Sequence, residues 1–321
     1  MSKAKRPTNI ETELAKVAAC REDPTSPSAL VVLRDALERR SSFAVAAAAK
    51  LVGEGELEAL APLLAAAYAR IADHDPGCQA KTAIVETLCR IGRDEGETFL
   101  HASTCRQLEA AWGPPVDTAA ALRGHAAAGL ASMLHPEAGV TIAGLLADPE
   151  WVARSGAARA APRLPSDVAV PLLVLKATVG DSNVEVLGDC FGSLLDVAPE
   201  RMLRFVAERL EAEEGTAEQA ALALGESRLE TAFVPLREYS ERATGARRGV
   251  ALLALALLRR DEAYAYLYAL VGEADTRTAA LALDALAVHK HDARVRDAAL
   301  AAARARGDRA ILAKAEQAFA A

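Results

Sequence analysis

The sequence has few aromatic side chains and none of the short motifs that mark familiar enzyme sites. Only 4% of its 321 residues are aromatic, which argues against a surface that stacks on successive nucleic-acid bases. It contains no GxSxG nucleophile elbow, P-loop, HExxH zinc motif or dinucleotide-binding glycine fingerprint. We therefore predict no catalytic residue, no cofactor and no metal, and we expect that the chain is not an enzyme.

Paired cysteines and long apolar runs are also absent. The five cysteines are odd in number and scattered without a CxxC pair, so no disulfide framework is expected. Charges interrupt the alanine-rich segments well before the roughly 20 apolar residues that a membrane span needs. Residues 1–9, MSKAKRPTN, are predicted to be a disordered basic leader, and no apolar run follows them. We expect a cytoplasmic protein with no membrane contact. Its net charge of −7 weighs against nucleic-acid binding.

What the sequence does contain is a repeat. An alanine-rich segment with a basic residue in its first turn is clearest at residues 276–290, TRTAALALDALAVHK. Copies of it align on small or aliphatic residues at positions 126, 157, 188, 220, 250 and 279, in steps of 29 to 32 residues. Such a period is typical of helical hairpins, and one hairpin cannot bury its alanine-rich face alone. We predict an all-α, right-handed α-solenoid that runs as a single domain over residues 10–321.

An arginine stands just before the small pair in several copies. The residues are Arg123, Arg154, Arg247 and Arg277, and an aliphatic and alanine run follows each pair. This pattern resembles HEAT repeats, and more closely the short HEAT-like repeats of the phycobilin lyase type. The resemblance implies the solenoid fold. It also implies two functional alternatives, chromophore handling of the phycobilin lyase type and nucleic-acid binding of the HEAT-like DNA glycosylase type.

The four arginines can be interpreted in two ways. At one point in each repeat they would line an edge of the array, as a basic track for an acidic peptide or a phosphate. Alternatively, each guanidinium pairs with a carboxylate or a loop carbonyl of a neighbouring repeat and is structural. Sequence alone leaves both open, and all four are candidate binding residues.

The repeat is interrupted at about residues 95–118. From Ala83 to Ala126 the step lengthens to 43 residues, and the excess contains Trp112 beside Gly113-Pro114-Pro115. Insertions in repeat arrays tend to lie on one face, often the binding face. Trp112 is therefore a candidate contact residue. The alternative is that its ring folds back onto the helices and holds the loop in place.

Two groups of polar residues are candidates for a metal site or an acid–base site. Cys78, Cys89, His101 and Cys105 carry the N and S donors that zinc prefers, but their spacing fits no familiar zinc pattern, so we predict no metal site. Asp73-His74-Asp75 combines carboxylates with an imidazole, as acid–base sites do, and equally suits a solvated turn.

The leading functional hypothesis is a scaffold or adaptor that binds a protein or peptide on the concave face of the solenoid. The candidate binding residues are Trp112, Arg123, Arg154, Arg247 and Arg277. Besides the two alternatives that the resemblance implies, homo-oligomerisation through the tyrosine-rich segment at 261–272 is a third.

Overall fold

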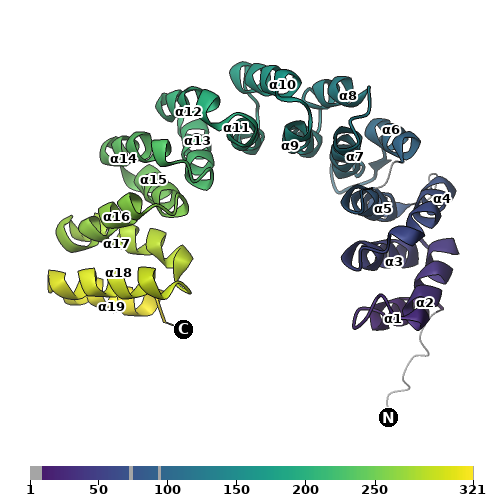
Figure 1. The fold of residues 1–321 in the computed structure, drawn as a ribbon, viewed down its shortest axis with the longest axis horizontal. Coiled ribbons are helices and arrows are strands. Elements are labelled where there is room, and N and C mark those ends of the chain that lie inside the picture. Colours follow the sequence, from purple (N-terminus) through teal and green to yellow (C-terminus); the bar gives the residue numbers. More distant parts are fainter. Residues whose placement is uncertain (1–8, 72–74, 93–94, 321) are drawn as a thin grey trace, which may run out of the picture. The chain divides into compact units, whose positions relative to one another are not determined.

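The computed structural model describes residues 9–71, 75–92 and 95–320, and nearly all of them lie in short helices or the turns between them (Figure 1). The chain divides into two compact units, residues 1–169 and 170–321, with the boundary inside α10 (Ser166–Val179). Within each unit, antiparallel helical hairpins stack side by side. The predicted all-α solenoid of HEAT-like hairpins is thereby confirmed. A single domain over 10–321 stays a prediction. Residues 1–8 of the predicted leader lie outside the described residues.

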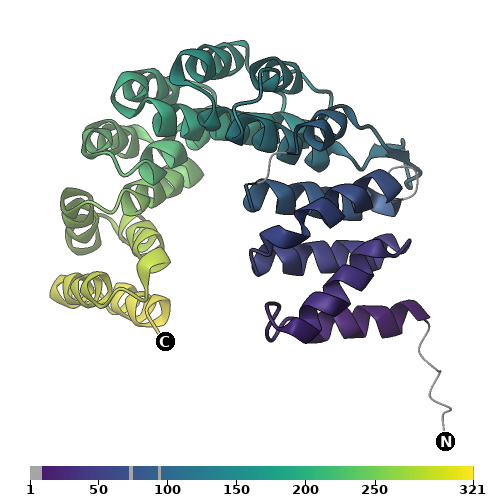
Figure 2. The same ribbon diagram turned by 45° about the vertical axis from the view of Figure 1, so that its right-hand side comes forward.

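In the described part of the first unit, α2 pairs with α3, α4 with α5, α6 with α7 and α8 with α9 as helical hairpins. The second helix of each hairpin packs on that of the next, so α3, α5, α7 and α9 form one layer. Figure 2 shows the purple and blue helices of this unit lying one above another. The helices are α1 (Asn9–Ala19), α2 (Pro27–Glu38), α3 (Ser42–Glu54), α4 (Ala61–Ile71), α5 (Gln79–Arg90), α6 (Gly96–Thr104), α7 (Ala120–Ser132), α8 (Ala138–Leu145) and α9 (Trp151–Ala160).

The second unit repeats the arrangement. Its layer of second helices runs through α11, α13, α15, α17 and α19, each packed on the one before it. The helices are α11 (Val184–Val197), α12 (Pro199–Ala207), α13 (Glu214–Glu226), α14 (Phe233–Arg242), α15 (Gly245–Leu257), α16 (Asp261–Glu273), α17 (Thr276–Leu286), α18 (Ala293–Arg306) and α19 (Arg309–Ala318). The segment singled out in the sequence, TRTAALALDAL, is α17, as the repeat predicted.

Small residues make the second helices pack closely. Ala126 and Ala127 on α7 and Ala157 on α9 are completely buried where these two helices meet. At the closest point, a Cβ built on Gly124 would lie 2.9 Å from the Cα of Gly156. Only hydrogen fits at that crossing, which explains why the repeats are rich in alanine and glycine and poor in aromatic residues.

Aspartates begin several of the second helices. The Asp275 carboxylate accepts the backbone N–H groups of Arg277 and Thr278 at the start of α17. Asp308 does the same for Ala310 and Ile311 at the start of α19. These bonds satisfy N–H groups that have no partner inside the helix. Asp275 and Asp308 are therefore N-caps.

The tyrosine-rich helix α16 packs as its spacing predicts. Tyr264 and Tyr268, four residues apart, stack with their ring centroids 6.3 Å apart. Tyr266 points elsewhere and lies 3.2 Å from the hydroxyl of Ser240 on α14. His289, at the end of the next helix, contacts Tyr264 edge-on, and its Nε2 lies 3.0 Å from the carbonyl of Ala256. All three tyrosines are half-buried among neighbouring helices. No helix of the described ranges is long and apolar enough to cross a membrane.

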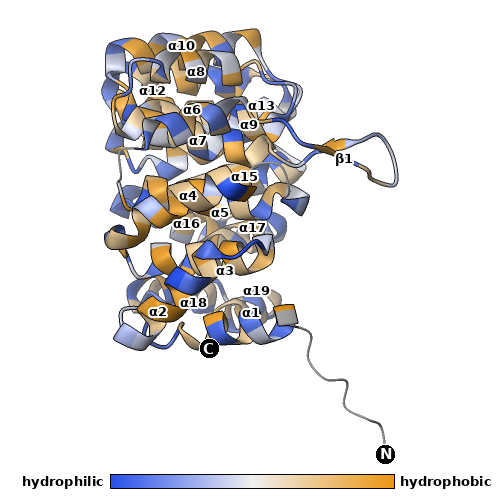
Figure 3. Cartoon of the chain, turned by 90° about the vertical axis from the view of Figure 1, so that its right-hand side faces the viewer, coloured by the Kyte–Doolittle hydropathy of each residue, from blue (hydrophilic) through white to orange (hydrophobic). Residues whose placement is uncertain are grey.

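The interruption at residues 95–118 departs from the regular hairpin pattern of the first unit. It contains the short helix α6 and a β-hairpin of β1 (Leu108–Glu109) and β2 (Val116–Asp117), paired antiparallel. Figure 3 shows this hairpin projecting from the helices of its unit. The extra residues predicted from the sequence therefore extend outward and leave the packing of α5 on α7 in place.

Candidate functional site

The segment 105–119, here named the Trp112 hairpin, combines an apolar tip with a polar base. Trp112 is 109% exposed, and Leu108 and Val116 on the stem are 71% and 52% exposed. The ring does not fold back onto the helices, so the alternative that it holds the loop in place is wrong. Across the stem, Thr118 N–H donates to the Gln107 carbonyl at 2.9 Å. A solvated indole therefore stands on a paired stem, as the contact hypothesis requires.

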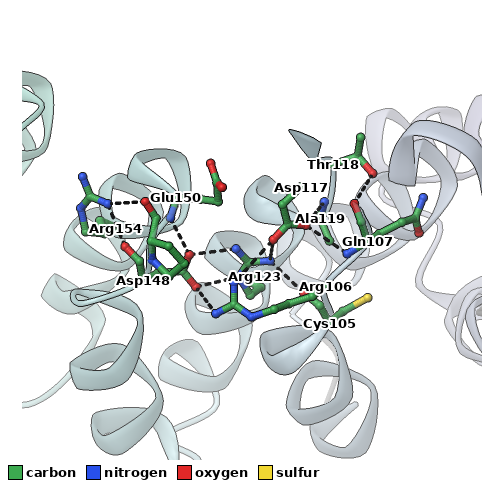
Figure 4. Close-up of polar contacts among 11 residues, drawn as sticks. Cys105, Arg106, Gln107, Asp117, Thr118, Ala119, Arg123, Asp148, Glu150 and Arg154 are labelled. Carbon is green, nitrogen blue, oxygen red and sulfur yellow. Dashed lines mark hydrogen bonds and ion pairs between the residues drawn. The ribbon is translucent and has the colours of Figure 1, made fainter. Parts of the chain in front are cut away.

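The base of the hairpin is a buried ion network centred on Arg123 of α7 (Figure 4). Its side chain is only 1% exposed. One nitrogen donates to Asp117 Oδ2 at 2.8 Å and also to the Cys105 carbonyl at 2.8 Å. The other two donate to the Asp148 carboxylate at 2.9 and 3.0 Å, a paired geometry that only arginine offers. Arg123 thus fastens both ends of the hairpin to the loop before α9.

The charges in this network stabilise one another. Burial by itself would raise the pKa of Asp117, but the N–H groups of Gln107 and Ala119 and the guanidinium of Arg123 outweigh it and lower that pKa. Burial would likewise lower the pKa of Arg123, and its bonds to Asp148 and Asp117 reverse the effect. Asp117 and Arg123 are therefore both charged at neutral pH.

Asp148 links this network to the next helix. Besides Arg123, its carboxylate accepts the Glu150 N–H at 2.8 Å and the half-exposed Arg106 at 3.0 Å. Arg154 of α9 donates to the carbonyls of Asp148 and Pro149 at 2.8 and 2.9 Å and is 8% exposed. Arg123 thus pairs with a carboxylate of the next repeat, as the structural alternative expects. The bonds from Arg154 to Asp148 and Pro149 stay within its own hairpin.

This placement favours the structural interpretation for two of the four arginines. Arg123 and Arg154 lie inside the fold, where their donors meet carboxylates and loop carbonyls. Arg277 is exposed and Arg247 is half-buried. In the repeat of Arg247 it is Arg248 that faces the neighbouring helix, where it bonds to Thr278 Oγ1 at 3.1 Å. A binding role for Arg247 and Arg277 stays a prediction.

A second cluster lies beside the hairpin stem, against the start of α5. Lys81 is 2% exposed, and its ammonium lies 2.6 Å from Gln107 Oε1 and 3.8 Å from Cys105 Sγ. Interaction with the Cys78 thiol, together with the charge of Lys81, lowers the pKa of Cys105 despite its partial burial. The same thiol interaction and burial raise the pKa of Cys78. Two inequivalent thiols and a cation therefore meet here.

Two aromatic side chains complete the surroundings of these thiols. The Tyr68 hydroxyl on α4 lies 3.0 Å from His101 Nδ1 on α6, and the rings meet edge-on. Burial raises the pKa of Tyr68, and the nearby Cys105 and Cys78 add to the shift. A neutral tyrosine thus lies near both thiols.

The structure places the residues that were weighed as zinc ligands or as an acid–base group. Cys78, Cys105 and His101 do converge, whereas Cys89 lies at the far end of α5, near Ser132. Within the described ranges, no three His, Cys, Asp or Glu side chains are arranged to hold a metal. Residues 73 and 74 lie outside the described part. Asp75 is 3% exposed and caps α5 by accepting the Lys81 N–H at 2.8 Å.

Sequence reasoning missed the acidic half of the site. Asp117 and Asp148 are buried at 6% and 4% exposure and carry the network, yet neither was a candidate. A usable signal existed, because each aspartate stands a few residues before an alanine-rich helix that has an arginine in its first turn. An N-cap position followed by a basic residue predicts such a pairing. For Gln107, no feature of the sequence indicated that it belongs to the site.

Comparisons with known proteins show a likeness to solved structures. No family model and no curated protein matches the sequence significantly. Among solved structures, the chain is similar to the complex of CpcE and CpcF of phycocyanin lyase from Nostoc sp. PCC7120, at 17% identity and a TM-score of 0.35. The alignment covers 86% of this chain and 93% of that one. The neighbour is a phycocyanin lyase, the type of protein whose repeats this sequence resembles.

One earlier prediction is corrected at this point. We expected that the chain is not an enzyme, and the solved complex that it matches is named as a lyase. That expectation is withdrawn. At this identity and TM-score the likeness carries no activity to the present chain.

Proposed function

We propose that this chain binds a protein partner through the Trp112 hairpin and the adjoining ends of α5 and α7. The observation that carries the proposal is the complete exposure of Trp112, one of only two tryptophans in the chain. Tryptophan is enriched among residues that dominate binding energy, because its large ring buries much apolar area with little loss of side-chain freedom.

The stem supports this role because it is already ordered. Arg123 joins Asp117 and the Cys105 carbonyl, the two ends of the hairpin. Glu109 on β1 accepts the Gly77 N–H at 2.7 Å, which fixes the stem to the turn before α5. A binding element that is held in one conformation loses less entropy when a partner binds.

The chemistry of the tip defines the partner. Leu108 and Val116 extend the apolar surface of Trp112 along the stem, and Pro114-Pro115 restrict the backbone of the tip. The complementary surface is an apolar pocket deep enough to admit an indole. Binding along the layer of second helices, as the concave-face hypothesis holds, is compatible with this contact because the stem adjoins α5 and α7.

Replacement of Trp112 by alanine is expected to weaken partner binding by about 2 kcal/mol, roughly thirtyfold in Kd. Stability should change by no more than about 0.5 kcal/mol, because a fully exposed ring has no packing to lose. To identify the partner, a photo-crosslinking amino acid is placed at position 112 of the full chain in its source cells. The Kd of the purified partner is then measured by calorimetry for wild type and variant.

The matched control for the crosslinking carries the same amino acid at Val31, which is 67% exposed on α2 and distant in sequence from the hairpin. A specific adduct at position 112 that is absent at position 31 supports the proposal. Equal labelling from both positions, or an alanine variant that binds within twofold of wild type, would overturn it. An adduct between two copies of the chain would assign the hairpin to self-association.

A chromophore-handling role of the phycobilin lyase type is the second candidate, and the repeat pattern of Arg123 and Arg154 before small pairs motivates it. It predicts that a free linear tetrapyrrole added to the purified chain shows a shifted and intensified visible absorption band. An unchanged spectrum at saturating protein would count against this candidate and leave the protein-binding proposal standing.

A further inference from the structure

The start of the Trp112 hairpin lies along the segment that begins α5. Gln107 donates to the Asp75 carbonyl at 2.6 Å, and Lys81 donates to Gln107 at 2.6 Å. With the bond from Gly77 to Glu109, these contacts fix residues 105–109 beside residues 75–81. Each of the two segments carries one cysteine in the contact.

The two cysteines differ in access and surroundings. Cys78 is completely buried in η2 (Pro76–Cys78), the turn before α5, whereas Cys105 is half-buried at the end of α6. The Lys81 ammonium lies 3.8 Å from Cys105 Sγ and favours its thiolate form. A reachable thiolate beside a protected thiol is the arrangement by which redox-sensing proteins form a disulfide. In this structure all five cysteines are free thiols.

We propose that Cys105 and Cys78 are a redox-active pair, in which Cys105 attacks an external low-molecular-weight disulfide of the glutathione class and Cys78 resolves the product. The pair would oxidise to an intramolecular disulfide between the hairpin and the turn before α5. This proposal does not depend on Trp112 binding a partner.

The chemistry balances in two exchange steps. The Cys105 thiolate attacks one sulfur of oxidised glutathione, the S–S bond breaks, and one glutathione leaves as a thiolate that takes a proton from solvent. Cys78 then loses its proton and attacks Cys105 Sγ, which breaks the mixed disulfide and releases the second glutathione, protonated by the proton that Cys78 lost. Two protein thiols are oxidised, and one glutathione disulfide is reduced to two thiols.

The other charged groups around Cys105 favour this order of attack. His101 on α6 adds to the effect of Lys81, whereas Asp117 on β2 opposes it. Tyr68 on α4 is neutral at physiological pH, because burial raises its pKa. The remaining half-buried cysteine, Cys89, has its pKa raised by burial, and is the natural reference thiol.

The first test treats the reduced full-length chain with oxidised glutathione, quenches with acid, and maps the products by mass spectrometry. Wild type is expected to lose two thiols and to yield a peptide that links Cys78 to Cys105. Cys78→Ser should stop at one glutathione adduct on Cys105, and Cys105→Ser should give neither product at position 78. Cys89→Ser is the control and should behave as wild type.

A stable glutathione adduct on wild-type Cys105 without the linked peptide would overturn the pairing. Reaction of Cys105→Ser at the wild-type rate would overturn the role of Cys105. Circular dichroism first establishes that each serine variant folds, and the mapping of wild type decides the question if one does not.

The second test measures alkylation of the reduced protein by iodoacetamide against pH. At pH 7, Cys105 is expected to react at least about tenfold faster than Cys89, because the thiolate is the nucleophile. Lys81→Met should slow Cys105 and move its reaction midpoint to higher pH without changing Cys89. Equal rates for the two cysteines, or an unchanged profile in Lys81→Met, would contradict the proposed activation.

Discussion

Arg123→Met is expected to destabilise the first unit by about 3–5 kcal/mol at pH 7. Removal of the guanidinium leaves the buried carboxylates of Asp117 and Asp148 with only the half-exposed Arg106 and backbone N–H groups as partners, and breaking a buried ion pair in this way costs several kcal/mol. Methionine retains much of the side-chain volume, so the loss reports on charge. Urea unfolding followed by tryptophan fluorescence measures it, because both tryptophans, Trp112 and Trp151, belong to the first unit.

The control for this variant is Arg277→Met, which removes an exposed arginine and should change stability by no more than about 0.5 kcal/mol. An Arg123→Met protein as stable as that control would show that the network contributes nothing.

Low pH should remove the stabilisation that the ion pair between Arg123 and Asp117 provides. The pKa of Asp117 is lowered in the fold, so its stabilisation is present above the unfolded value of about 3.9 and is lost as pH falls through the folded value. Wild type and Arg123→Met should therefore converge in stability below about pH 4. A stability difference that stays constant between pH 7 and pH 3 would contradict the assignment of the effect to the buried charges.

Gly156→Ala is expected to destabilise the first unit by about 3 kcal/mol, at the upper end of overpacking effects. A Cβ on Gly156 would lie 2.6 Å from the Cα of Gly124, and a backbone atom cannot turn aside as a side chain can. To accommodate the methyl group, α7 and α9 must separate along a contact that is otherwise filled by alanine. Thermal unfolding monitored by circular dichroism and tryptophan fluorescence measures the loss.

The comparison variant is Gly144→Ala in α8 of the same unit, where an added Cβ would meet nothing within 4 Å. There the substitution should be neutral or stabilise by up to about 1 kcal/mol, because alanine favours the helix. If the two glycine variants unfold together, close approach of α7 and α9 is not what limits side-chain size at this crossing.

Local patterns in the sequence predicted most of the fold. The repeated segment at 276–290 contains α17, and the aligned positions 126, 157, 188, 220 and 250 lie in α7, α9, α11, α13 and α15. These agreements arise because apolar spacing, caps and turn residues act within a few positions of one another. The lengthened step between Ala83 and Ala126 likewise located the Trp112 hairpin. Extra residues in a regular array cannot fit between the packed second helices, so they project outward.

The candidate site was less predictable, since its residues come together from separate segments. Arg123 matched the repeat pattern, yet only the packing of α7 beside the loop before α9 shows that it is buried against Asp148, 25 residues away. Trp112 was a candidate binding residue in the sequence. The residues adjacent to it along the chain do not determine whether its ring packs against the helices or points to solvent. Its exposure follows from the pairing of the stem.

The sequence by itself determined that this protein is an array of alanine-rich helical hairpins with one insertion, because periodicity and capping are properties of adjacent residues. The tertiary structure decided which charges are buried, where Trp112 points, and that Cys78, Lys81 and Cys105 meet. Those outcomes depend on contacts between segments that are distant along the chain, and the free energy of such contacts is set by burial and geometry that exist only after the helices have packed.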